Sequence, residues 1–97
     1  MFADVGFSNA ETELNEPIDN LPNLGPTSAA WLREAGIKTI IDLERFGSVA
    51  AYRLAKQKHP EATLNLLWGL EAGLLGQDWR ELSEQEKGRL RNKLVGD

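Results

Sequence analysis

The 97-residue chain contains no cysteine and only one histidine. Without cysteine it cannot form disulfides, thiolate nucleophiles or cysteine-ligated zinc or iron sites, and such a composition suits a reducing compartment such as the cytoplasm. The single histidine, His59, excludes a two-histidine metal site. No segment has the apolar length that a membrane span needs, and the start lacks the basic and apolar regions of a secretory signal. We therefore expect a cytoplasmic protein that does not enter the membrane.

Residue patterns typical of enzymes are also missing. The sequence has no phosphate-loop or dinucleotide-binding pattern, and His59 has no serine or carboxylate partner at motif spacing. Because His59 precedes Pro60 at an expected helix end, we predict an exposed loop position for it. The chain is thus expected to be non-enzymatic, with no catalytic residue, no cofactor and no metal.

Positive charge is scarce at the beginning of the chain. Residues 1–16 contain Asp4, Glu11, Glu13 and Glu16 but no lysine or arginine, and few large apolar residues follow Phe7. Such a segment has little to bury, so we predict a flexible acidic arm over residues 1–16, followed by one domain over residues 17–97. The net charge of −4 gives no general attraction to nucleic acid, so any DNA contact requires a local patch.

Helix signals mark five segments of the predicted domain. Each begins at a capping residue or at proline, and the first four end at glycine or proline. They are Pro26–Ala35, residues 40–46 after Thr39 with Asp42 as a capping box, Val49–Lys58 after Ser48, residues 64–75 after Thr63, and the stretch that follows Ser83 with Glu86 as a second capping box. No alternating strand pattern persists, so we predict an all-α fold, a compact bundle of about five helices.

The most apolar segment, residues 64–75, is apolar on nearly every face, which predicts a helix at the centre of the bundle. Its Trp68 is expected in the core. Glu71, the one carboxylate of this helix, would need a partner there, which a tryptophan N–H or Arg80 could supply. Trp79 is expected to clamp the last helix, whereas Trp31 is a candidate interface residue.

The stretch LPNLGP at residues 21–26 leads directly into the first predicted helix and resembles a helix-hairpin-helix motif. In that motif, backbone N–H groups at the start of the second helix hold a DNA phosphate. Asn23 stands where the motif has its first glycine, and asparagine tolerates a left-handed backbone. The candidate DNA contacts are Asn23, Gly25, Thr27 and Ser28. The alternative, which we favour because no basic cluster lies nearby, is a corner that packs two helices.

The last predicted helix carries four cations within seven residues. They are Lys87, Arg89, Arg91 and Lys93. This candidate basic surface could contact DNA or an acidic protein partner. The alternative, which we favour, is a solvated face whose charges complement the helix dipole.

Three pieces of the sequence resemble the C-terminal domain family of the bacterial competence regulator TfoX, also called Sxy. They are LPNLGPTSAAWL, LNLLWGLEAGLLG and DWRELSEQEKGRL, within a resemblance that covers residues 21 to about 94. The resemblance implies an all-helical fold and a role in controlling DNA-uptake genes together with the cAMP receptor protein. The expected function is therefore regulation through protein contacts, with direct, weakly sequence-specific DNA binding as the alternative. The partner, the target genes and the oligomeric state remain open.

Overall fold

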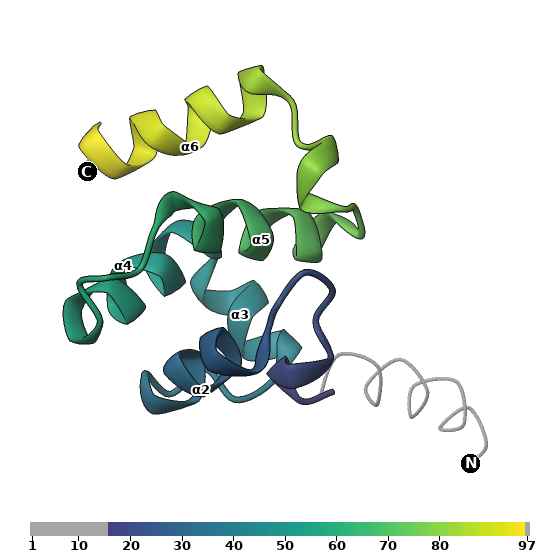
Figure 1. Ribbon diagram of the computed structural model, residues 1–97, viewed down its shortest axis with the longest axis vertical. Coiled ribbons are helices and arrows are strands. Elements are labelled where there is room, and N and C mark those ends of the chain that lie inside the picture. The colour runs from purple at the N-terminus through teal and green to yellow at the C-terminus, as the bar shows by residue number, and fades with distance from the viewer. Residues whose placement is uncertain (1–15, 97) are drawn as a thin grey trace, which may run out of the picture.

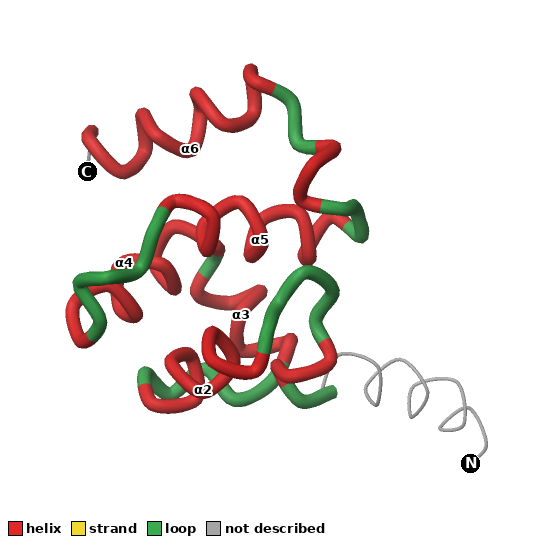
Figure 2. Tube along the Cα trace, viewed as in Figure 1, coloured by secondary structure: helices red, strands yellow, loops and turns green. Residues whose placement is uncertain are grey.

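The structure is a computed structural model that describes residues 16–96. It consists of helices joined by short loops (Figures 1 and 2). The elements are the 3-10 turn η1 (Ile18–Asn20), the helices α2 (Pro26–Glu34), α3 (Ile40–Phe46), α4 (Ser48–Lys58) and α5 (Leu64–Leu75), the 3-10 turn η2 (Trp79–Glu81), and the helix α6 (Glu84–Gly96). The predicted all-α fold and its five helices are confirmed. The predicted flexible arm lies outside the described residues, apart from Glu16.

Most helix starts follow the predicted capping chemistry. The Thr39 hydroxyl accepts a hydrogen bond from the N–H of Asp42, whose carboxylate accepts one from the N–H of Thr39, so the capping box of α3 is complete. Thr63 caps α5 by accepting from the N–H of Asn65. The N–H of Glu86 donates to the Ser83 hydroxyl at the start of α6.

The predicted cap at Ser48 is wrong. Ser48 is the first residue of α4, Gly47 stands before it with a φ of 83°, and no side chain caps the helix. The Ser48 hydroxyl instead donates to Oε1 of Glu71 in α5, at 2.6 Å. A carboxylate is a stronger acceptor than a neutral group, so a contact with another helix takes the place of the local cap.

The helix α5 runs across the middle of the molecule, between α6 on one side and α2 on the other (Figure 1). Leu67 and Leu70 of α5 are fully buried, and Trp68 is 5% exposed, so the predicted central helix and core tryptophan are confirmed. The other large, fully buried side chains come from the elements around α5 and from the loop after α2. They are Ile18, Leu32, Ile37 and Leu43.

Two glycines allow the LPNLGP hairpin to approach α5 closely. A Cβ on Gly73 would lie 2.8 Å from the Leu21 side chain and 2.9 Å from the carbonyl oxygen of Pro22. A Cβ on Gly69 would lie 3.3 Å from the carbonyl oxygen of Asn23. The hairpin is therefore packed tightly against the central helix.

Within residues 16–96, no helix combines the length and the apolar character that a membrane crossing requires.

Candidate binding groove

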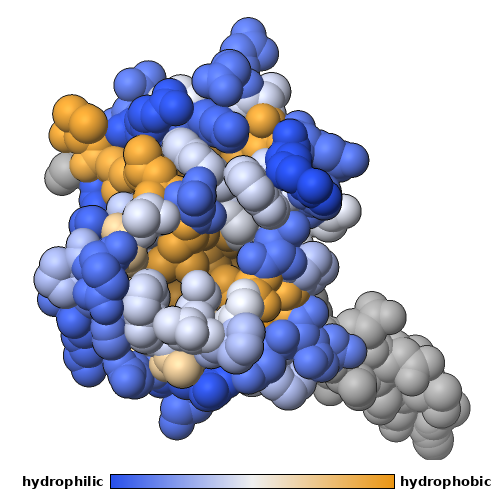
Figure 3. All heavy atoms as spheres, viewed as in Figure 1, coloured by the Kyte–Doolittle hydropathy of each residue, from blue (hydrophilic) through white to orange (hydrophobic). Residues whose placement is uncertain are grey.

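A groove of about 360 Å³ opens between the hairpin, α2, the loop after α4, and α5. We call it the Trp31–Trp79 groove, after the two aromatic residues in its lining. Its lining consists of Asn23, Leu24, Ser28, Trp31, Glu61, Ala62, Thr63, Asn65, Leu66, Gly69 and Trp79. Figure 3 shows a hydrophobic area in the middle of this face, framed by more polar side chains. Its volume falls within the range of about 300–1,000 Å³ that is usual for ligand sites.

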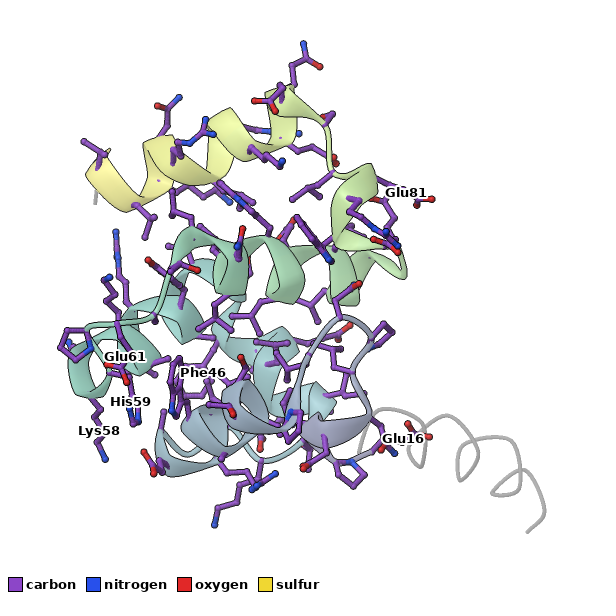
Figure 4. All side chains as sticks on the ribbon, in the orientation of Figure 1. Glu16, Phe46, Lys58, His59, Glu61 and Glu81 are labelled. Carbon is purple, nitrogen blue, oxygen red and sulfur yellow. The ribbon has the colours of Figure 1, made fainter. Side chains whose placement is uncertain are left out.

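Trp31 is held in place by His59. The two rings stack with their centroids 4.5 Å apart and their planes 12° from parallel. His59 lies just beyond α4, as the predicted loop position requires, but the prediction that it is exposed is wrong, because its side chain is only 22% exposed. Its Nε2 lies 2.9 Å from Oε1 of Glu34, and this hydrogen bond lowers the pKa of the Glu34 carboxyl. His59 and Glu61 lie close together beyond the end of α4 (Figure 4).

Trp79 is anchored through its backbone by the hairpin. The N–H of Trp79 donates to Oδ1 of Asn23 at 3.2 Å, while Nδ2 of Asn23 donates to the carbonyl of Gln77 at 2.7 Å. Asn23 has a φ of 73°, so the predicted left-handed turn is confirmed. Trp79 is 38% exposed, and Leu82 is the buried residue of the segment that leads into α6. The hairpin thus positions one wall of the groove.

The floor of the groove is apolar, and its rim is polar. Ala62, Leu66 and Gly69 are buried, whereas Asn65 is exposed. Glu61, whose side chain is 65% exposed, is the only ionisable residue in the lining. The arrangement suits an extended segment with apolar and hydrogen-bonding groups and, next to Glu61, a positive charge.

The structure divides the candidate DNA contacts between two places. Asn23 and Ser28 line the groove, whereas Gly25 and Thr27 are exposed at the start of α2. The side chain of Asn23 already bonds to the protein through both its oxygen and its nitrogen. Arg33, the cation of α2, pairs with Asp19 and lowers the pKa of that carboxyl through a hydrogen bond. A phosphate contact at the hairpin stays a prediction.

The four cations of the candidate basic surface point in two directions. Lys87 and Arg91 lie over the ring of Trp68, at 5.6 Å and 5.3 Å from its centroid. Arg89 and Lys93 instead line a second hollow, of about 240 Å³, together with Glu71 and Glu86. One pair therefore fastens α6 to α5, and the other borders two carboxylates, so they do not form a single phosphate-binding face.

Glu71 has a different partner from those predicted. It accepts from Ser48, as described above, rather than from a tryptophan N–H or from Arg80. Arg80 forms an ion pair with Asp78 at 2.9 Å and with it fixes the turn η2. Glu71 thus has the predicted structural role, but its partner is on α4. Ser48 lies opposite Glu71 where α4 and α5 pack together.

The sequence revealed Trp31 as an interface candidate but not the groove beside it. From the sequence, the central helix includes Asn65, Leu66 and Gly69, and nothing marks these residues as part of a groove. The loop that carries Glu61 has no sequence motif that would identify it as a binding site. One feature of the sequence could have indicated the groove. Small or polar residues interrupt an otherwise leucine-rich helix, and such residues leave space at the helix surface. Among residues 16–96, no group of three histidine or acidic side chains is placed to hold a metal ion.

Comparisons with known proteins agree with the fold. The family model described as the TfoX C-terminal domain matches residues 14–94. A triclinic crystal structure of an uncharacterized protein from Listeria monocytogenes is 30% identical, with a TM-score of 0.74, and the match covers 82% of this chain and 94% of that one. A tetragonal crystal structure of a protein of unknown function from the same organism is 29% identical, with a TM-score of 0.73 and coverages of 80% and 95%. Among curated proteins, none matches significantly.

Proposed function

Because this chain belongs to the TfoX C-terminal domain family, we propose that it is a non-enzymatic regulatory module that binds another protein through the Trp31–Trp79 groove. Its place would be in the bacterial cytoplasm, in the transcriptional control of DNA-uptake genes. The partner would be a component of the transcription machinery or an activator such as the cAMP receptor protein. This regulatory assignment follows the resemblance to TfoX and extends it by a specific surface.

The observation that carries the proposal is the construction of the groove. Other residues support its two aromatic walls. The ring of His59 stacks on Trp31, and Asn23 accepts a hydrogen bond from the backbone of Trp79. A side chain that is fixed before binding, as Trp31 is by the stacked ring, loses little conformational entropy on contact, and tryptophan is enriched among the residues that dominate binding energy. The only histidine of the chain is used in this support, which favours a binding role over a catalytic one.

The proposal is tested by titrating the labelled domain with purified cAMP receptor protein and with isolated RNA polymerase subunits. Two variants alter the groove: Trp79→Ala removes a wall, and Asn65→Arg places a bulky charge at its rim. Val95→Ala is the matched control, because Val95 is 87% exposed on α6 and does not line the groove. We expect one partner to bind the parent and the control equally, and both groove variants at least about tenfold more weakly. Equal binding by all four proteins, or by none of them, would overturn the proposal.

Direct DNA binding is a second candidate, and one observation favours it. After the left-handed Asn23, Pro26 opens α2 and no side chain caps that helix start, so a phosphate could accept from its backbone N–H groups. Fluorescence anisotropy of labelled duplex DNA at low and physiological salt tests this candidate. Binding that falls with salt, and that is lost in Gly25→Glu or in the double variant Arg89→Glu/Arg91→Glu, would establish it over the protein-contact proposal.

A further inference from the structure

We infer that the ligand of the Trp31–Trp79 groove is an extended peptide segment of the partner protein that presents an arginine to Glu61. The inference rests on the proposed function and adds the chemical identity of the bound segment. It follows from the charge of the groove, from its aromatic walls and from the polar groups at its rim.

The charge of the groove selects a cation. Glu61 is the only ionisable group in the lining, and Glu34 lies close by, bonded to the His59 ring that supports Trp31. Lys56 of α4 is engaged by the backbone on either side of Glu61, since its Nζ donates to the carbonyls of Pro60 and Ala62 at 2.8 and 2.7 Å. The carboxylate of Glu61 lies 3.7 Å from Nδ1 of His59, and its side chain is 65% exposed, so it remains open to a cation of the partner.

The aromatic walls favour arginine over lysine. A guanidinium is planar and weakly hydrated, it stacks on an indole face, and it can form two parallel hydrogen bonds to a carboxylate. Glu61 and Trp31 border the same groove, so one guanidinium can contact both kinds of group. Lysine offers the charge without the flat stacking surface.

The remaining lining fits a peptide backbone and an apolar neighbour. Within the described residues, no hydrogen bond engages the side chains of Ser28 and Asn65, which leaves a hydroxyl and an amide for the peptide groups of a ligand. The floor at Leu66 and Ala62 accepts an aliphatic side chain next to the arginine.

The same groove is unfavourable for single-stranded nucleic acid. Tryptophan faces can stack on bases, but such sites combine stacking with a positively charged groove that follows the phosphates. Here the lining contributes one carboxylate and no cation, so phosphates would be repelled. The inference therefore commits to a peptide, and nucleic acid becomes an outcome of the test.

The experiment is selection from a displayed library of short random peptides, with three baits: the parent domain, Glu61→Gln and Glu61→Lys. We expect the parent to enrich peptides with an arginine beside an aliphatic residue. Glu61→Gln should lose the preference for arginine, and Glu61→Lys should enrich aspartate or glutamate in its place. Glu61 is exposed, so neither substitution should disturb folding, and circular dichroism of each bait verifies this.

One enriched peptide is then synthesised with arginine and with its neutral isostere citrulline. The parent should bind the arginine form about tenfold more tightly, and Glu61→Gln should bind both forms equally. Enrichment without arginine, an unchanged preference in Glu61→Lys, or tighter binding of single-stranded oligonucleotides than of any peptide would overturn the inference. Failure of this inference is distinguishable from failure of the proposed function. If a peptide binds without arginine and its binding is lost in Trp79→Ala, the preference for arginine is wrong but the groove is still a protein-binding site.

Discussion

Gly73 lies where the hairpin touches the central helix, and its lack of a side chain allows that contact. We expect Gly73→Ala to destabilise the domain by about 1–3 kcal/mol, because the new Cβ would overlap Leu21 and the carbonyl of Pro22. Gly88→Ala in α6 is the control: a Cβ there has nothing within 4 Å, so it should stabilise the helix by about 0.5–1 kcal/mol. Urea denaturation followed by circular dichroism measures both changes. Equal effects at the two glycines would contradict the close packing of the hairpin.

Asn23 combines a left-handed backbone with two hydrogen bonds to residues 77 and 79. Asn23→Ala should cost about 2 kcal/mol, since it loses both bonds and places an ordinary residue in the left-handed region. Asn23→Gly loses the same bonds without that strain, so it should cost about half as much. Thermal unfolding of the two variants gives the difference, and a larger cost for glycine would show that backbone strain is not the deciding factor.

At the scale of the elements, the contact between Ser48 and Glu71 fastens the start of α4 to the middle of α5. Ser48→Ala should cost about 1–3 kcal/mol, because it leaves the half-buried carboxylate without its partner. With Glu71→Leu added, the double variant should be more stable than the sum of the single changes predicts, since no unpaired polar group remains. A double-mutant cycle from urea denaturation measures the coupling. Strict additivity would contradict the assigned hydrogen bond.

The elements themselves were predictable because their signals are local. The capping boxes at Thr39 and Ser83, the proline at residue 26 and the glycine at residue 76 each act within one helical turn of the chain. Ser48 has the same local signal, and there the prediction was wrong, because Glu71 lies 23 residues away in sequence and competes for the hydroxyl. Partners far apart in sequence could not be assigned from spacing alone.

At the scale of the whole molecule, the groove could not be predicted for the same reason. It needs the hairpin, α2, the loop after α4, and α5 to be packed together, and no one of these segments reveals it. Trp31 could be singled out from sequence, but its stacking on His59 depends on where α4 ends relative to α2. The four cations of α6 looked like one surface in sequence, yet the helical turn separates them into two pairs with different neighbours.

Carboxylates held by hydrogen bonds tie the stability of the whole domain to pH. Arg80 lowers the pKa of Asp78 from its ordinary value of 3.8 to about 2, chiefly through a side-chain hydrogen bond. The folded protein thus binds this proton less readily than the unfolded chain, so the stabilisation is present above about pH 4 and is lost as the pH falls through about 2. Hydrogen bonds from Arg33 and from the backbone N–H of Lys38 lower the pKa values of Asp19 and Asp42 in the same direction.

We therefore expect the urea midpoint of the parent to fall between pH 5 and pH 2, and the part due to Asp78 to be missing in Asp78→Asn. The two proteins should differ most above pH 4 and converge as the pH approaches 2, because the parent then loses the charge that the variant never had. Glu44→Gln, at an exposed position of α3, is the control for removal of a surface carboxylate. Because Asp78 caps the turn that carries Trp79, the tryptophan emission of the parent should shift over the same pH interval. A constant difference in midpoint between parent and Asp78→Asn at every pH would show that the carboxylate acts through its shape and not its charge.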